Sequence, residues 1–279
     1  MTARPLNDHS RLSINDATTK RQWTLAQAIE GYAAQGVHGI SVWRDKLAEC
    51  GVKEAARMLA DHGMTVTGLC RGGMFPAPTA AERRAAIDDN RRAIEEAAAI
   101  GAQCLVLVVG GLPKGSKDIA GARSMVLDGL YDIVEEARAA RMPLAIEPLH
   151  PMYAADRACV NTMAQANDLC DRLGAGVGIA VDVYHVWWDP DLEREIRRAG
   201  KERILAFHIC DWLVPTTDLL LDRGMMGDGV IDIPRIRGWV EAAGYDGHHE
   251  VEIFSAENWW KRDPAEVVAT CKERYLTAV

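Results

Sequence analysis

Residues 137–147 read ARAARMPLAIE, in which a charged, Ala-rich helix end is followed by a short break and an apolar run that finishes in Glu147. The same order of helix end, small or Gly-containing break and short apolar run recurs in six other stretches. They are AAQGVHGISV (33–42), LADHGMTVTGL (59–69), AAAIGAQCLVLVV (97–109), CDRLGAGVGIAVD (170–182), RRAGKERILAFH (197–208) and EAAGYDGHHEVE (241–252). With the opening run LSINDAT (12–18), the sequence predicts eight strands that alternate with helices.

Strands that alternate with helices predict a parallel sheet. Dividing 279 residues among eight units leaves about 35 each, which is enough for a strand, a helix and two short loops. No ninth unit and no linker-like stretch interrupts the series, so we expect a closed (β/α)8 TIM barrel of the α/β class, with one domain over residues 1–279. The GxGxxG motif is missing after the first strand, so the sequence lacks the main signal of a dinucleotide-binding fold.

Three helix starts carry local signals. Thr79 and Glu82 have the spacing of a capping box, and Asp-Pro pairs at 189–190 and 263–264 are typical of a first helical turn.

The composition narrows the class of protein. The chain is 48% hydrophobic and 26% charged, which is typical of a globular protein, and its formal charge of −8 argues against nucleic-acid binding. Seven cysteines without a CxxC pair do not resemble a disulfide scaffold. Because the sequence has neither a signal peptide nor an 18-residue apolar run, we expect a cytoplasmic protein without a membrane partner.

The last four predicted strands each end in a residue type that binds metals: Glu147, Asp182, His208 and Glu252. Side chains alternate along a strand, and the bulky residues next to these four belong on the helix-facing side, so the four point into the barrel. Three carboxylates and an imidazole in a low-dielectric barrel mouth repel one another or take up protons unless a cation neutralises them. Any one of these carboxylates could instead form a buried salt bridge or a helix cap, but the set of four predicts one divalent metal ion per chain.

Oxygen-rich ligation with a single histidine suits Mn²⁺ or Mg²⁺, and Co²⁺, Fe²⁺ and Zn²⁺ also fit. We expect Mn²⁺.

An ordered set of motifs resembles a known family. The set comprises Glu147, the DxxH motif of Asp182 and His185, the HxxD motif of His208 and Asp211, GDG at 227–229, and GYDG at 244–247 followed by Glu252. It is similar to the sugar phosphate isomerase/epimerase group of xylose isomerase-like barrels, which shares its fold with AP endonucleases of the endonuclease IV type.

The resemblance implies that Glu147, Asp182, His208 and Glu252 hold one Mn²⁺-like ion and that His185 contacts a carbohydrate substrate. It further implies that Glu147 and Glu252 exchange protons with that substrate, and that the protein is a homodimer or homotetramer. The chain departs from the nuclease pattern, because its third and fourth strands end in GLCRGG and LVVGG and residue 230 is Val rather than His.

The leading hypothesis is therefore a metal-dependent sugar isomerase or epimerase acting on a ketose or keto sugar through a metal-stabilised enediolate. The alternative is a lyase that cleaves a 3-keto glycoside by β-elimination, with His150 as the catalytic base. A nuclease and a non-catalytic sugar-binding protein are weaker hypotheses.

The walls of the substrate pocket are assigned to Trp43, Arg71, Trp187 and Arg223, of which Arg223 belongs to a long seventh loop able to close over the site. Glu250 and Asp228 are expected to support the metal ligands through hydrogen bonds.

Overall fold

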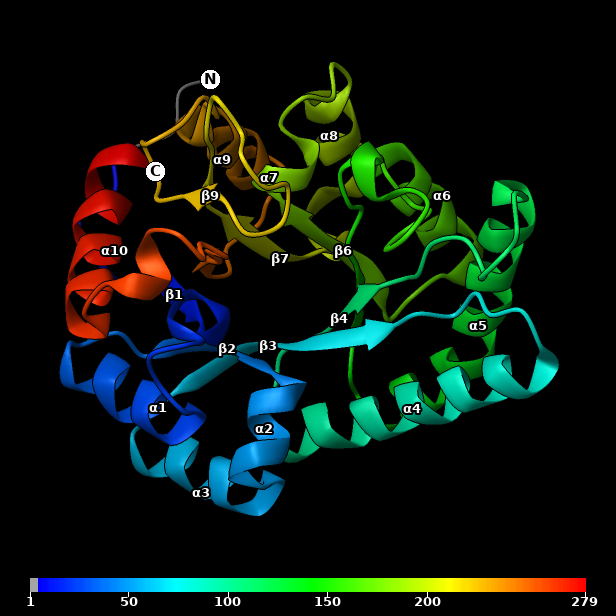
Figure 1. Ribbon diagram of the computed structural model, residues 1–279, viewed down its shortest axis with the longest axis horizontal. Helices are drawn as coiled ribbons and strands as arrows, with labels where there is room; N and C mark the ends of the chain where they lie inside the picture. Colours follow the sequence, from blue (N-terminus) through cyan, green and yellow to red (C-terminus); the bar gives the residue numbers. More distant parts are fainter. Residues whose placement is uncertain (1–4) are drawn as a thin grey trace.

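Residues 5–279 of the computed structural model form a closed barrel of eight parallel strands surrounded by helices, as the sequence predicts (Figure 1). The strands are β1 (Leu12–Asn15), β2 (Gly39–Trp43), β3 (Thr65–Gly73), β4 (Leu105–Val108), β5 (Leu144–Ile146), β6 (Val177–Asp182), β7 (Ile204–Ile209) and β10 (His249–Val251). They follow one another round the barrel in chain order, and the pairing of β1 with β10 closes the ring.

Helices alternate with the strands and cover the outside of the barrel (Figure 1). They are α1 (Leu25–Ala34), α2 (Arg44–Cys50), α3 (Val52–Asp61), α4 (Ala80–Ala99), α5 (Ile119–Ala139), α6 (Met163–Leu173), α7 (Val183–Val186), α8 (Leu192–Arg203), α9 (Ile233–Ala242) and α10 (Pro264–Ala278). Short 3₁₀ segments η1 (Asp16–Thr19), η2 (Pro151–Tyr153) and η3 (Trp259–Lys261) lie in loops, and β8 (Asp211–Trp212) pairs antiparallel with β9 (Arg223–Gly224). Helix α10 lies beside α1, where the Gln35 side chain donates a hydrogen bond to the Ala265 carbonyl at 3.2 Å.

Two of the three predicted helix starts are confirmed. Thr79 accepts a hydrogen bond from the Glu82 backbone N–H, and Asp263 caps α10 in front of Pro264. The prediction at 189–190 is wrong, since α8 begins at Leu192 with Asp191 at its N-cap, so the Asp-Pro pair belongs to the preceding turn.

Alternation along the strands divides the apolar residues between two layers. Ile146, Val181, Phe207 and Val251 are buried in the layer between strands and helices. Ala145, Ala180 and Ala206 point the other way and pack with Cys70, Cys104 and Val106 inside the barrel. Small residues inside leave room for the polar side chains at the strand ends.

No helix within residues 5–279 is both long enough and apolar enough to cross a membrane.

Candidate metal centre

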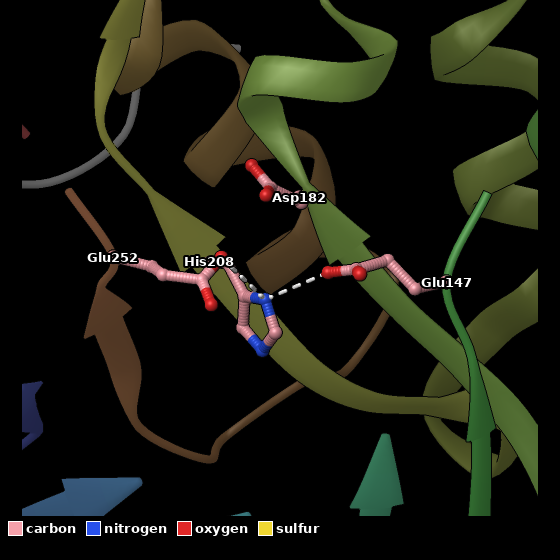
Figure 2. A group of neighbouring side chains, drawn as sticks. All are labelled: Glu147, Asp182, His208 and Glu252. Atoms are coloured by element: carbon pink, nitrogen blue, oxygen red, sulfur yellow. Dashed lines mark hydrogen bonds and ion pairs between the residues drawn. The ribbon is translucent and has the colours of Figure 1, made fainter. Parts of the chain in front are cut away.

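The four predicted metal ligands come together at the C-terminal end of four adjacent strands (Figure 2). Glu147 directly follows β5, Asp182 ends β6, His208 lies in β7 and Glu252 directly follows β10. One donor atom from each lies within 4.8 Å of the other three, and all four residues are buried. Within residues 5–279 these are the only side chains grouped in a way that could hold a metal ion.

His208 has its two ring nitrogens in different surroundings. Nδ1 lies 3.1 Å from Glu147 Oε1 and 4.0 Å from Glu252 Oε2, whereas Nε2 lies 3.5 Å from Glu250 Oε1 and has no hydrogen-bond partner among residues 5–279. A neutral imidazole with its proton on Nε2 therefore directs that proton toward Glu250 and offers the Nδ1 lone pair to a metal. A carboxylate behind a ligating histidine is the usual arrangement in metal sites, and it agrees with the supporting role expected of Glu250.

A polar layer inside the barrel lies against the ligands. The Asn15 amide donates to Glu250 Oε1 at 2.8 Å and to Glu252 Oε1 at 3.0 Å, which fixes one carboxylate relative to the other. Thr67 donates to Glu250 Oε2 at 2.9 Å and lies 2.9 Å from the Ser13 hydroxyl. Asn15 is not among the predicted site residues, although Ser13 and Asn15 are inward positions of β1 at the same two-residue spacing as Glu250 and Glu252.

Arg223 is buried at the metal centre and supplies a positive charge there. Its guanidinium donates to Asp182 Oδ2 at 3.0 Å and to Glu252 Oε2 at 3.1 Å, and lies 3.2 Å from His185 Nε2. The guanidinium carbon also lies 4.4 Å from the Tyr184 ring centroid and 5.1 Å from that of Phe254. Arg223 thus neutralises one of the carboxylate charges.

The remaining negative charge perturbs the ionisation of the ligands. Burial raises the pKa of Glu252 to about 8, although Arg223 and His208 act in the opposite direction. Burial alone would deprotonate His208, but Glu250, Glu147 and Glu252 outweigh it and raise the pKa of His208 well above its ordinary value of 6.5. Glu252 and His208 therefore hold protons at neutral pH in the metal-free centre. To bind a metal, both groups must lose these protons, because the metal binds their lone pairs.

These shifts predict a pH dependence of metal binding. Metal binding displaces protons from Glu252 and His208, so we expect Mn²⁺ affinity to rise at least about tenfold per pH unit between pH 6 and 8. The stability of the metal-free protein should fall over the same range, because both pKa values are raised on folding and the folded state binds more protons than the unfolded state. Calorimetric titration with Mn²⁺ in buffers of different ionisation enthalpy, together with thermal unfolding, measures both effects. Affinity independent of pH would contradict the prediction.

A small cavity opens directly above the ligands. Its volume is about 50 Å³, room for about one or two water molecules. Glu147 and Glu252 line the cavity, whereas Asp182 and His208 are 0% exposed. The two glutamates are thus the ligands that face a bound molecule.

Four of the predicted substrate-binding residues line this cavity: Trp43, Arg71, His185 and Arg223. Burial lowers the pKa of His185 to about 3, so its imidazole is neutral at pH 7, and the backbone N–H of His150 donates to its Nδ1 at 3.2 Å.

Two other predicted residues, His150 and Trp187, are not among the cavity-lining residues within 5–279. The His150 ring stacks on Trp212 with 5.0 Å between centroids, and Trp187 packs against the same Trp212 at 5.8 Å. Three further residues line the cavity without having been predicted: Tyr153, Arg157 and Phe254. They come from loops, and residue spacing in the sequence does not determine the path of a loop.

Residues 213–222 form the expected loop over the site. The hydroxyl groups of Tyr153 and Tyr184 both donate to the Leu219 carbonyl, the latter at 2.8 Å, and Leu220 lines the cavity. A sugar is larger than this cavity, so we expect Leu220 and the segment around it to shift when a sugar binds.

The HxxD and GDG motifs organise the chain that follows this loop. Asp211 accepts hydrogen bonds from the backbone N–H groups of Gly227 at 2.9 Å and Ile231 at 3.0 Å, and a Cβ on Gly229 would lie 2.2 Å from the Trp212 carbonyl. Asp228 forms a 3.1 Å ion pair with Arg274 and no hydrogen bond to the ligands among residues 5–279. The prediction that Asp228 supports the ligands is therefore wrong.

Comparison with known proteins places these observations in a family context. The family model described as "Xylose isomerase-like TIM barrel" matches residues 28–270. The solved structure of protein SMc04130 from Sinorhizobium meliloti 1021 is 61% identical, with a TM-score of 0.96 over 97% of this chain and 99% of that chain.

More distant similarities involve a sugar epimerase and a zinc-containing barrel. L-ribulose-5-phosphate 3-epimerase UlaE of Salmonella typhi is 26% identical over 222 residues, which are 77% of this chain and 72% of the epimerase. The IolI protein, solved with a bound zinc atom, is 21% identical over 96% of this chain and 98% of that chain, with a TM-score of 0.84. At that identity the IolI structure is evidence of a shared fold.

Proposed function

The chain belongs to the family of xylose isomerase-like TIM barrels, and from its metal centre we propose that it is a divalent-metal-dependent isomerase or epimerase of a ketose or keto sugar. The similarity to a ribulose-phosphate 3-epimerase supports a sugar as the substrate.

The observation that carries the proposal is the unequal exposure of the four ligands. Asp182 and His208 are sealed from the cavity, but Glu147 and Glu252 line it and can exchange protons with a bound molecule. A site that only held a structural ion would have no need for this asymmetry.

The donor set fits a divalent ion, with Glu147, Asp182, His208 Nδ1 and Glu252 as ligands, and its three carboxylates favour Mn²⁺. Such an ion supplies positive charge that stabilises the negative charge developing on the oxygens of the substrate when a neighbouring C–H is deprotonated.

The remaining roles follow from contacts. Arg223 and neutral His185 both face the cavity, where the guanidinium can donate to substrate oxygens. Because His185 Nδ1 accepts from the His150 N–H, its Nε2–H is the group that can donate to a substrate. Glu252 is held in place by Asn15 and Arg223, and Glu147 lies next to His208. In this proposal the two glutamates hold the transferred proton on opposite sides of the substrate carbon. Return of the proton to the opposite face of that carbon gives epimerisation, and return to the neighbouring carbon gives isomerisation.

The contacts of His150 favour the isomerase over the lyase alternative. His150 stacks on Trp212, and its Nδ1 accepts a hydrogen bond from the Met152 N–H at 3.3 Å. A base for β-elimination needs to reach the substrate, and His150 is not part of the cavity wall. Assembly as a homodimer or homotetramer and a cytoplasmic location stay predictions from the sequence.

Proton exchange with solvent tests the proposal. The Mn²⁺-loaded protein, incubated in deuterium oxide with a panel of ketopentoses, ketohexoses and their phosphates, is expected to introduce deuterium next to the carbonyl of at least one sugar, detected by NMR. The H150A variant should retain the exchange. Loss of exchange in H150A, together with ultraviolet absorbance of an unsaturated ketone when wild type acts on a 3-keto glycoside, would support the lyase instead.

A further inference from the structure

Two arginines line the cavity without an acidic partner. Arg71 lies near the end of β3, Arg157 follows η2, and neither forms an ion pair or a side-chain hydrogen bond within residues 5–279. They are close enough for the charge of Arg157 to add to burial in lowering the pKa of Arg71. Two like charges held together in a cavity wall favour an anion between them.

Neighbouring arginines differ from this pair. Arg44, one residue after β2, forms ion pairs with Asp89 at 2.8 Å and Glu96 at 2.6 Å, so its charge is already neutralised. Arg223 is neutralised by Asp182 and Glu252.

The acidic ligands do not need Arg71 or Arg157 for neutralisation. The charges of Glu147, Asp182 and Glu252 are balanced by Arg223 together with one divalent ion, and one further positive charge balances the buried carboxylate of Glu250. Arg71 and Arg157 then leave the metal-loaded cavity with excess positive charge beside the acid/base pair, in a chain whose formal charge is −8.

We infer that Arg71 and Arg157 form an anion-binding subsite that takes the phosphate or carboxylate group of the substrate. This inference rests on the proposed function and specifies its substrate as a keto sugar with an anionic group at the end remote from the metal-binding oxygens.

The two arginines reach the cavity from different parts of the structure. Arg71 lies in β3 where the pairing with β4 shifts register between Cys70 and Gly72. Arg157 lies 5.6 Å from the Tyr153 ring centroid, and the hydroxyl of Tyr153 donates to the Leu219 carbonyl. Contacts through Tyr153 thus connect Arg157 to residues 213–222.

A first experiment measures anion binding without turnover. Inorganic phosphate is titrated calorimetrically into the Mn²⁺-loaded full-length protein. It should bind wild type and the R84M control, in which an exposed α4 arginine is replaced, and bind R71M and R157M at least about tenfold more weakly. The same titration with acetate distinguishes a carboxylate site from a phosphate site. If neither anion binds, or if R71M and R157M bind as wild type does, the subsite is refuted.

A second experiment compares matched substrates: a neutral ketopentose, its 5-phosphate and the corresponding keto sugar acid. Wild type should act on one of the anionic sugars with kcat/KM at least about 100-fold above that on the neutral sugar. For the anionic sugar, kcat/KM of R71M and of R157M should fall about 10- to 100-fold, mainly through a higher KM. The loss for the neutral sugar should be at least about tenfold smaller. Equal loss on neutral and anionic sugars would overturn the subsite. Absence of proton exchange with every sugar, alongside intact phosphate binding, would instead count against the proposed function.

Discussion

Replacement of Glu252 by glutamine is expected to lower the rate of sugar interconversion by about 10²- to 10⁴-fold, because the amide cannot accept or return a proton. Glutamine keeps an oxygen that can face the metal and the nitrogen of Asn15, so the variant should still bind Mn²⁺ at saturating concentration. The rate is measured by NMR on metal-saturated protein, with metal content determined on the same samples.

Glu250 offers a matched control for this substitution. It lies two residues from Glu252 on the same inner face of the barrel and shares the Asn15 amide, but it does not line the cavity. E250Q should weaken metal binding through its effect on His208, yet retain interconversion within about tenfold once saturated with Mn²⁺. If E252Q and E250Q lose activity equally at full metal occupancy, Glu252 acts only as a ligand.

The second large effect is expected for His208, the one nitrogen ligand. H208A removes Nδ1 and the positive charge nearest Glu147, and leaves Glu252 with Arg223 as its remaining cationic partner. We expect Mn²⁺ affinity to fall by more than about 100-fold, since even residues that only support a ligand contribute about 10- to 100-fold. Elemental analysis of protein after dialysis against Mn²⁺ should find about one ion per chain in wild type and none in H208A.

H150A is the appropriate control, because it removes an imidazole that stacks on Trp212 outside the ligand group. Circular dichroism establishes whether both variants remain folded. Equal metal content in H208A and wild type would rule out the assignment of the centre.

The convergence of the strand-end residues could be predicted from the geometry of a parallel barrel. In a parallel barrel, all strands end at the same face and side chains alternate strictly, so Glu147, Asp182 and Glu252 had to converge once their strands were identified. The same alternation predicts Asn15 and Glu250 as inward positions, and it also explains the small residues below the ligands.

The loops were less predictable, because their conformation depends on contacts between segments far apart in sequence. His150 has the same three-residue offset from Glu147 as His185 has from Asp182, yet His185 lines the cavity and His150 packs on Trp212. The offset is equal, but α7 continues β6 directly, whereas Glu147 is followed by an irregular turn. Arg157 and Tyr153 reach the cavity only through the fold of that turn.

The hydrogen bonds from Tyr153 and Tyr184 to the Leu219 carbonyl hold residues 213–222 close to the metal centre, and this affects how the protein exchanges its metal ion. Glu147 and Glu252 line the cavity together with Leu220, so an ion that leaves these two ligands passes through the cavity in which we expect the sugar to bind. A sugar bound there would therefore slow release of the ion. The cell could then exchange one metal for another only between catalytic cycles, and the metal carried would reflect the supply during idle periods as much as intrinsic affinity.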